Sequence, residues 1–341
     1  MFIDRGLVKF VSTLKNQIYN HLYIILLGSW RCLRNWYFGR RGMLPQVHLY
    51  HKENHTPVDS YWARHTVGSR PFVSRAQSIT YLKRRSSEHP PIKELMQLYR
   101  DHSGKILLDY GCGPGNDLIG FALYSHAKRL IGIDISKKSL HLAGYRLALH
   151  RIDPKEVELI NISDAFSKIP LDDSSVDYIN CSGVLHHVSD PALILREFYR
   201  VLKPGSRACI MVYNYNSIYL HLVVAYVRMI LDGEFRGQSV REAFSKNTDG
   251  RDCPISRCYR PEEFIEICGN VNFKDVDYAG GYFWNYVLKL FKRYNRIALE
   301  DDRLSIEHKN FLKGLKQDDQ GFLTHQGKYA GVGGVYWLTK S

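Results

Sequence analysis

The middle of the chain alternates short apolar runs with longer stretches whose apolar residues recur every three or four positions. Short apolar runs bounded by turn residues are typical of buried strands, and the recurring pattern is typical of amphipathic helices. Strands alternating with helices in this way predict an α/β fold with a doubly wound, mostly parallel sheet. The expected strands are 105–110, 129–134, 157–162, 177–182 and 207–213, and the expected helices are 92–100, 116–125, 137–150 and 191–202.

Three further apolar stretches lie outside this alternation. Residues 217–231 are apolar on nearly every side, so a helix there must be buried on several sides. Residues 283–294 combine aromatic with basic residues, and residues 18–38 are aromatic and aliphatic between basic flanks. The rest of the carboxyl-terminal part is expected to hold strands at 272–278 and 331–338 and a helix that begins at Pro261.

The first expected strand ends in Asp109 and a turn that contains Gly111, Gly113 and Gly115. Glycines at this spacing let the backbone turn tightly and approach a ligand closely. The next strand ends in Asp134, whose carboxylate can accept hydrogen bonds from both hydroxyls of a ribose. The glycine turn and the acid together predict a bound nucleoside cofactor.

The charge of this turn distinguishes between nucleoside cofactors. Its third glycine comes one residue earlier than in the dinucleotide fingerprint, and Asp109 stands two residues before the first. An acid there is unfavourable beside a pyrophosphate but favourable beside a cationic amino acid. S-adenosylmethionine has an ammonium, a sulfonium and no phosphate, so these residues favour it over NAD.

The order of the later motifs makes this interpretation specific. After Asp134 come a strand that ends in Asp164, the sequence Ser-Gly-Val-Leu-His-His-Val at 182–188, and the turn Leu-Lys-Pro-Gly at 202–205. This succession resembles the class I S-adenosylmethionine-dependent methyltransferases, and within them the small-molecule branch that includes the ubiquinone and menaquinone C-methylases. The resemblance covers residues 100–215, and it implies a Rossmann-like sheet of seven strands whose last strand is antiparallel.

The resemblance also implies a role for each motif. The glycine turn holds the cofactor, Asp134 binds the ribose, and Ile135 forms a wall of the adenine pocket. Asp164 and Ala165 contact the adenine, and the segment from Ser182 onward lies nearest the transferred methyl group. The expected cofactor-binding residues are Asp109, Gly111, Cys112, Gly113, Gly115, Asp134, Ile135, Asp164, Ala165 and Ser182. Ser206 departs from the family, which often has a second glycine there, but that turn is distal to the cofactor.

Methyl transfer from a sulfonium is an in-line displacement, which depends on holding donor and acceptor together away from water. A base is needed only if the acceptor must lose a proton. His186 and His187 follow the fourth expected strand, where the resemblance places the acceptor, and a neutral imidazole accepts a proton near physiological pH. One of the two is expected to face the pocket. Tyr213 and Asn214, after the fifth strand, are candidates for orienting the acceptor.

Composition narrows the range of partners. Seven cysteines are scattered without a Cys-x-x-Cys pair, and several lie on or beside expected strands, which predicts core thiols in a cytoplasmic protein. The net charge of +13 fits nucleic acid, anionic lipid or an acidic substrate, and a solvated basic surface that binds no partner is the alternative. The sequence Asn-Cys-Ser-Gly at 180–183 lacks the prolines and stacking aromatic of amino-methylating DNA enzymes, which argues against nucleic acid.

Residues 1–45 carry seven Lys or Arg and a single acid. The uncharged run 18–30 is too short for a comfortable membrane span. Three interpretations stay open: a helix at a membrane surface, a targeting peptide, and a helical arm packed on the domain or on another subunit. The His-rich segment 46–70 is expected to be irregular. Its spacing matches no standard zinc pattern, so no metal is expected.

The aromatic pair Tyr61 and Trp62 lies just upstream of the core, where enzymes of this class carry a segment that folds over the cofactor. An aromatic face there suits a sulfonium, although ordinary packing explains the pair equally well. The chain is accordingly divided into four parts. They are an arm and cofactor-covering segment (1–75), a cofactor-binding core (76–216), a lid on the substrate side (217–260), and the end of the sheet (261–341) with a helical insertion at about 283–325.

These patterns favour a methyltransferase for a hydrophobic or amphiphilic small molecule, since apolar segments beside a basic surface suit a lipid-like substrate at a membrane. A second hypothesis is a methyltransferase for a polar metabolite, in which the apolar segments form a homodimer interface. A third is a silent cofactor-binding scaffold, which the intact set of acids disfavours. The acceptor atom, whether C, N, O or S, stays open.

Overall fold

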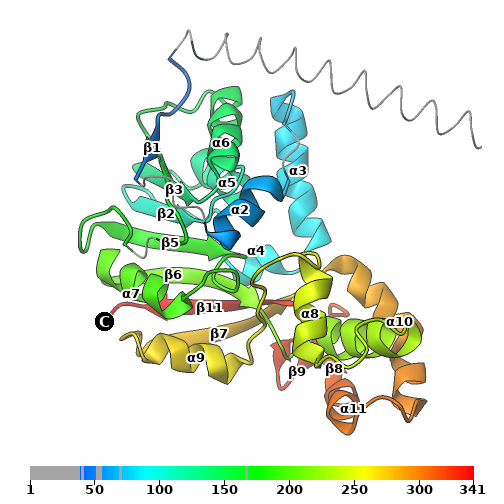
Figure 1. Cartoon of the computed structure of the whole chain (residues 1–341). Coiled ribbons are helices and arrows are strands. Elements are labelled where there is room, and N and C mark those ends of the chain that lie inside the picture. Colours follow the sequence, from blue (N-terminus) through cyan, green and yellow to red (C-terminus); the bar gives the residue numbers. More distant parts are fainter. Residues whose placement is uncertain (1–38, 40–41, 51–55, 69–70, 166–167) are drawn as a thin grey trace, which may run out of the picture.

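The computed structural model describes residues 39, 42–50, 56–68, 71–165 and 168–341. Its centre is a sheet of eight strands in the order β1-β4-β3-β2-β5-β6-β11-β7 (Figure 1). In the order of the sheet, the six strands β1, β4, β3, β2, β5 and β6 are parallel to their neighbours. Strand β11 is antiparallel to both β6 and β7, as the resemblance implied. The strands are β1 (Val47–Leu49), β2 (Ile106–Tyr110), β3 (Arg129–Asp134), β4 (Val157–Asn161), β5 (Val176–Ser182), β6 (Leu202–Tyr213), β7 (Asp275–Tyr282) and β11 (Gly333–Thr339).

The five strands expected from the central alternation are confirmed as β2 to β6, with small shifts at their ends. The largest shift is at the start of β6, which begins at Leu202 rather than at residue 207. Gly205 donates its backbone N–H to the carbonyl of Lys340, and Lys340 donates to Ser206, so the end of the chain extends this strand. Such pairing over a long sequence separation leaves no local signal.

The segment 46–70, expected to be irregular, forms an edge strand and a helix. Residues 47–49 pair with β4, which makes the expected count of seven strands one too few. Helix α2 (Pro57–Arg64) begins at a capping box, in which Thr56 and Asp59 bond each other's backbone N–H. Proline at the first helical position and an acid at the third are a readable start signal.

Two other expected boundaries were wrong. The helix expected at 92–100 ends early, because Gln97 and Tyr99 take left-handed backbone conformations with φ of 47° and 62°. Only α4 (Ile92–Leu95) remains of it. The strand expected at 272–278 is displaced to β7, since Asn272 also has a positive φ, of 75°, and ends the preceding helix in a turn.

Helices cover both faces of the sheet. On one face Phe198 and Phe264 are fully buried against β5, β6 and β11, and on the other Phe121 and Leu140 are buried against β2, β3 and β4. The first face is covered by α7 (Pro191–Val201) and α9 (Pro261–Gly269), and the second by α3 (Arg75–Glu88), α5 (Asn116–Tyr124) and α6 (Lys137–Leu149). The helices expected at 116–125, 137–150 and 191–202 are thus confirmed.

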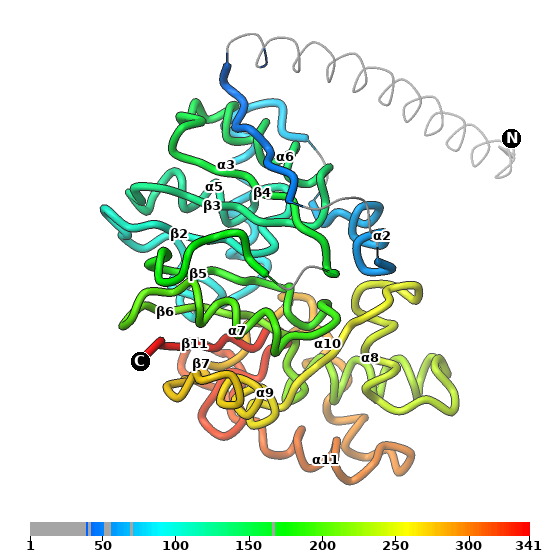
Figure 2. The backbone as a smooth tube through the Cα atoms, turned by 60° about the vertical axis from the view of Figure 1, so that its left-hand side comes forward, coloured from blue at the N-terminus to red at the C-terminus, as the bar shows by residue number. Residues whose placement is uncertain are grey.

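A second apolar core lies at one end of the sheet. The stretch 217–231 forms a π-helix, η1 (Tyr219–Leu231), which is buried on several sides as expected. Both views place α8, α10 and α11 together there (Figures 1 and 2). The elements around η1 are α8 (Val240–Thr248), α10 (Asn285–Glu300), α11 (Ile306–Lys313), β8 (Leu315–Gln317), β9 (Leu323–His325) and β10 (Lys328–Tyr329).

Within these described ranges, no helix combines the length and the apolar character needed to cross a membrane. The interpretations offered for residues 1–45 fall almost entirely outside the described residues, and they remain predictions.

Candidate functional site

A cavity of about 580 Å³ lies at the carboxyl ends of β2, β3 and β5. Strand β2 pairs with β3 on one side and with β5 on the other, so the strand order reverses at this point. Open α/β sheets bind ligands in the crevice at such a reversal. Each of the four parts into which the sequence was divided contributes residues to the wall of this cavity. Examples, one from each part, are Trp62, Asp109, Asp249 and Trp284.

The glycine turn forms one wall of this cavity. Gly111 and Gly113 have φ of 71° and 53°, a conformation that glycine adopts without strain. A Cβ on Gly111 would collide with Val184, whereas a Cβ on Gly113 would meet no atom within 4 Å. The backbone at Gly113 is therefore open to a ligand. Gly115 begins α5 against Ala143 and does not line the cavity.

Asp134, at the end of β3, presents its carboxylate to the cavity. One carboxylate oxygen accepts from the backbone N–H of Gly113 at 2.8 Å, and the other accepts from that of Ser136 at 2.7 Å. Burial raises the pKa of this carboxyl to about 6, and the two backbone hydrogen bonds lower it in part. Each oxygen keeps a lone pair for a further donor, as a ribose diol requires.

Asp109, at the end of β2, has an unsatisfied carboxylate oxygen. Its Oδ1 accepts from Asn180 Nδ2 at 2.8 Å, but its buried Oδ2 has no hydrogen-bond partner among the described residues. Burial raises the pKa of this carboxyl to about 8, with Asp117 as the next contributor. A buried orphan acceptor is costly, so the site favours a ligand that brings a donor or a positive charge.

An ion pair that sequence reasoning missed lies beside these acids. The Arg85 guanidinium, from α3, pairs with Asp117 in the first turn of α5, and Tyr99 donates its hydroxyl to the same carboxylate at 2.9 Å. Burial lowers the pKa of Arg85, but Asp117, Tyr99 and Tyr282 together raise it more, so the guanidinium stays charged. Asp117 directly follows the glycine turn, which was a usable signal. Arg85 had none, because α3 is distant in sequence.

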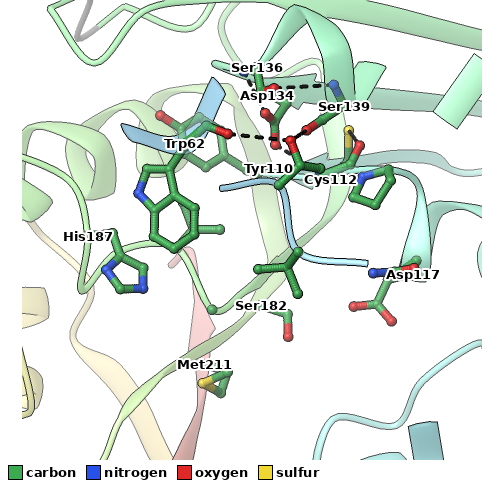
Figure 3. A pocket seen from close by; sticks show the side chains of 18 of the residues that line it. Trp62, Tyr110, Cys112, Asp117, Asp134, Ser136, Ser139, Ser182, His187 and Met211 are labelled. Atoms are coloured by element: carbon green, nitrogen blue, oxygen red, sulfur yellow. Dashed lines mark hydrogen bonds between the residues drawn. The ribbon is translucent and has the colours of Figure 1, made fainter. Parts of the chain in front are cut away.

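His187 stands at the other end of the cavity, where Figure 3 shows Trp62 beside it. The two rings lie 4.7 Å apart between centroids. His187 Nδ1 is 2.7 Å from the carbonyl of Ile255, and its Nε2 is 3.7 Å from a carboxylate oxygen of Asp249. Tyr213 donates its hydroxyl to the other oxygen of Asp249 at 3.1 Å. Asp249, which sequence reasoning did not single out, therefore connects the segment 217–260, the predicted lid, to this end of the cavity.

Three of the predicted site residues do not reach the cavity. His186 is fully buried, with both ring nitrogens unpartnered among the described residues, and it packs behind the wall at 3.9 Å from the Tyr213 ring. Ala165 is exposed beyond the end of β4, and Gly115 serves the turn. The predicted residues that line the cavity are Asp109, Gly111, Cys112, Gly113, Asp134, Ile135, Asp164, Ser182, His187 and Tyr213.

Two side chains have partners other than those expected. The carboxylate of Asp164 accepts from the backbone N–H and the hydroxyl of Ser189, which fix its orientation in the cavity wall, and its contact with adenine stays a prediction. The amide of Asn214 is buried and donates to the hydroxyl of Tyr278 and to two backbone carbonyls. Its role is therefore to close the end of β6, and it does not orient an acceptor.

Comparison with known proteins defines the family. Residues 101–255 match the family model described as a methyltransferase domain. Over 194 residues the chain is 30% identical to demethylmenaquinone methyltransferase of Listeria monocytogenes, a match that covers 55% of this chain and 79% of that protein. The chain belongs to the S-adenosylmethionine-dependent methyltransferases.

Other relatives of this methyltransferase are matched over less of their length. Ubiquinone biosynthesis O-methyltransferase of Neisseria meningitidis is 33% identical over 129 residues, which span 37% of this chain and about half (52%) of that relative. Among solved structures, geranyl diphosphate C-methyltransferase from Streptomyces coelicolor is similar with a TM-score of 0.47 and 16% identity. That match covers 83% of this chain and 97% of the other.

The cavity of this methyltransferase suits its cofactor, S-adenosylmethionine, both at the amino-acid group and at the ribose. The orphaned Oδ2 of Asp109 would accept from the ammonium, and the Arg85 guanidinium, 3.5 Å from the Ser182 hydroxyl, would face the carboxylate. Asp134 would hold the ribose, and Ile135 lines the wall beside it. The open backbone at Gly113 leaves room for the cofactor to lie against the turn.

Proposed function

We propose that this methyltransferase transfers the methyl group of S-adenosylmethionine to a hydrophobic or amphiphilic small molecule. The observation that carries the proposal is the character of the cavity beyond the glycine turn. Besides the polar His187, Thr248 and Asp249, its wall there consists of aromatic, thioether and aliphatic side chains, which exclude water and offer apolar contact area. These are Val58, Trp62, Val184, Met211, Tyr213, Tyr282 and Trp284.

The second apolar core supports this wall from behind. The ring of Trp284 lies 4.7 Å from that of Tyr219 on η1 and 6.3 Å from that of Tyr213. The two described apolar stretches, 217–231 and 283–294, are therefore packed largely against each other and against the site. This arrangement removes most of their apolar surface from a dimer interface, on which the polar-metabolite alternative depended.

The relatives point in the same direction. Two of the curated relatives are named for steps of ubiquinone and menaquinone biosynthesis. Their names do not fix the acceptor of this chain, because the first of them is matched over only about half of its length. They support a hydrophobic acceptor as the class to test first.

A basic helix face adjoins the acceptor end. Helix α10 directly follows Trp284, which lines the cavity. It exposes Lys289, Lys292, Arg293 and Arg296, whose spacing places them on one face. No ion pair with an acid engages these four side chains within the described ranges. We propose that this face meets an anionic head group or an anionic membrane surface.

The chain contributes position and exclusion of water to the reaction. When bound, S-adenosylmethionine supplies an electrophilic methyl carbon. The acids Asp109 and Asp134 line one end of the cavity, and the Trp62 ring lines it beside His187. An acceptor held against Tyr213 and Trp284 is kept in a dry environment, in which alignment lowers the barrier.

The test combines binding with transfer. S-adenosylhomocysteine should bind the full chain with micromolar affinity in calorimetry, and Asp134→Ala should abolish this binding while leaving the far-ultraviolet circular dichroism unchanged. Transfer is then followed with tritiated methyl groups on an octyl series (para-octylphenol, para-octylaniline, octanoic acid) and on a polar series (serine, ethanolamine, glucose). Transfer confined to the octyl series supports the proposal, and transfer confined to the polar series overturns it.

A further inference from the structure

Carboxyl groups dominate the charge of the cavity wall. Among the described residues that line it, Arg85 is the one lysine or arginine, and its guanidinium is paired with Asp117. The acids that line the cavity are Glu88, Asp109, Asp117, Asp134, Asp164 and Asp249. This acidic wall contrasts with the net charge of +13 of the whole chain. The cavity therefore favours ligands that carry or gain positive charge, and it disfavours an anionic acceptor.

Asp249 is the acid at the acceptor end, and its carboxylate is held in a fixed orientation. Tyr213 donates its hydroxyl to one carboxylate oxygen and Ser256 donates to the other, both at 3.1 Å. Tyr61 of α2 donates its hydroxyl to the backbone carbonyl of the same residue. The Asp249 side chain is 14% exposed. A carboxylate that is oriented in advance and largely shielded from water acts strongly on charge in the cavity.

The nearby histidine and arginine leave this negative charge in place. His187 Nε2 lies 3.7 Å from the Asp249 carboxylate, but burial lowers the pKa of His187 more than Asp249 raises it, so the ring is neutral at neutral pH. The Arg257 guanidinium donates to the backbone carbonyls of Val188 and Ser189, and it does not line the cavity. The acceptor end therefore presents a carboxylate without a matching cation.

Aromatic rings line the same end of the cavity. They belong to Trp62, Tyr213 and Trp284. The Trp62 ring lies 4.7 Å from that of His187, and the rings of Tyr213 and Trp284 lie 6.3 Å apart. The faces of such rings attract a cation. Rings and a carboxylate together suit a group that is positively charged and partly apolar, such as an alkylated ammonium.

Methyl transfer changes the charge of the acceptor, and the direction of this change depends on the acceptor atom. A neutral amine becomes an ammonium as it takes the methyl group, whereas a phenolate or a carboxylate loses its negative charge. A fixed carboxylate beside the acceptor stabilises the transition state of the amine more than its ground state. The same carboxylate repels an anionic acceptor before transfer. The charge of Asp249 thus distinguishes nitrogen from ionised oxygen.

We propose that the acceptor atom is the nitrogen of an amphiphilic amine and that Asp249 stabilises the positive charge this nitrogen gains. This inference rests on the proposed function and deepens it. The neutral amine uses its lone pair to form the bond to the methyl carbon, while the carbon–sulfur bond breaks and its electron pair stays on sulfur. The positive charge passes from sulfur to nitrogen, and the methylated nitrogen leaves as an ammonium or gives its proton to water. Asp249 therefore determines the class of acceptor.

The first test compares two acceptors that differ only in the reacting atom. The full chain, saturated with S-adenosylmethionine at neutral pH, is given para-octylaniline or para-octylphenol, and octanoic acid serves as the anionic acceptor. Transfer should be faster to para-octylaniline, and octanoic acid should not be methylated. Asp249→Asn should lower kcat/KM for para-octylaniline by on the order of 10²-fold. It should leave the slower transfer to para-octylphenol unchanged or raise it.

The matched control is Asp252→Asn, which removes the same charge from an exposed position in the same loop. It should leave the preference for para-octylaniline unchanged. An equal fall in transfer to both acceptors in Asp249→Asn would show a purely structural role and overturn the role of Asp249. Transfer to para-octylphenol or octanoic acid with none to para-octylaniline would overturn the nitrogen acceptor while leaving the proposed function intact.

The second test does not depend on turnover. Octyltrimethylammonium carries a permanent positive charge and cannot be methylated, and octanol has the same chain without the charge. Calorimetry uses the full chain saturated with S-adenosylhomocysteine, which occupies the cofactor end. Octyltrimethylammonium should bind about tenfold more tightly than octanol. Asp249→Asn should remove most of this preference, and Asp252→Asn should keep it. Equal affinities in the wild type, or the same preference in wild type and Asp249→Asn, would overturn the proposal even if no acceptor in the panel is methylated.

Discussion

At the scale of single residues, the cofactor end of the cavity brings several carboxyl groups together. A ligand that carries positive charge would offset the cost of burying their negative charges. Asp109, Asp117 and Asp134 all line it, and Arg85 is paired with only one of them. The raised pKa values of Asp109 and Asp134 have burial as their first cause. A site built in this way is destabilising while empty, and it recovers that free energy when a ligand carries positive charge into it.

The first prediction concerns the protonation of Asp109. Its pKa of about 8 leaves it largely protonated at neutral pH, whereas an ammonium binds its carboxylate form. Binding of S-adenosylmethionine should therefore release a proton, and affinity should fall by up to about tenfold per pH unit below this pKa. Calorimetry at neutral pH in phosphate and in Tris should give different heats in proportion to the protons released. Methylthioadenosine, which lacks the amino acid, is the control ligand and should show no such difference.

The second prediction follows from the same carboxyl in the empty protein. A carboxyl with a raised pKa binds its proton more tightly in the folded state, so its contribution to stability is present at low pH and is lost as pH rises toward about 8. Asp109→Asn removes this loss and keeps the acceptor for Asn180. The variant should melt a few degrees above wild type at about pH 9 and near it at about pH 5. It should also bind S-adenosylmethionine more weakly, and a variant less stable at both pH values would contradict this account.

At the scale of elements, helix α3 is tied to the site by the Arg85–Asp117 pair, although it lies outside the central alternation. Arg85→Met leaves a buried, unpaired carboxylate and should destabilise the protein by about 3 kcal/mol. Adding Asp117→Asn should restore stability but not cofactor affinity, because the guanidinium that would face the cofactor's carboxylate is still missing. Thermal melting and calorimetry on both variants separate these effects. Recovery of affinity in the double variant would show that Arg85 acts only through folding.

The elements that could be predicted from the sequence are those whose signal is local. Strands β2 to β6 are apolar runs bounded by turn residues, and the glycine turn, Asp109 and Asp134 follow them at fixed positions. Strand β1 exists because β4 offers it an edge, and α4 ends early because Gln97 and Tyr99 have positive φ. The residues of the site differ in the same respect. Arg85 and Asp249 reach the cavity by tertiary packing alone, so the local sequence does not predict them.

At the scale of the whole molecule, the second apolar core lies against the acceptor end of the cavity. Residues of η1, α8 and α10 pack together in this core, and its Tyr219 contacts the ring of Trp284, which lines the cavity. The basic face of α10 continues outward from this wall. An amphiphile with its tail against Trp284 would have its head group near Lys289, so a single subdomain would serve both parts of the substrate.

The last prediction tests this arrangement with vesicles. Replacing Lys289, Lys292, Arg293 and Arg296 by Gln in the full chain should weaken binding to vesicles that contain phosphatidylserine by on the order of 10²-fold or more, since each cation near the surface contributes about 1 kcal/mol. Binding should fall with added salt and be weak on phosphatidylcholine alone. The matched control replaces four exposed lysines that are dispersed over the core, Lys83, Lys128, Lys155 and Lys168. Equal losses in the two variants would mean that net charge alone drives binding. Full binding by the α10 variant would assign the contact to the amino-terminal segment, whose seven basic residues both variants retain.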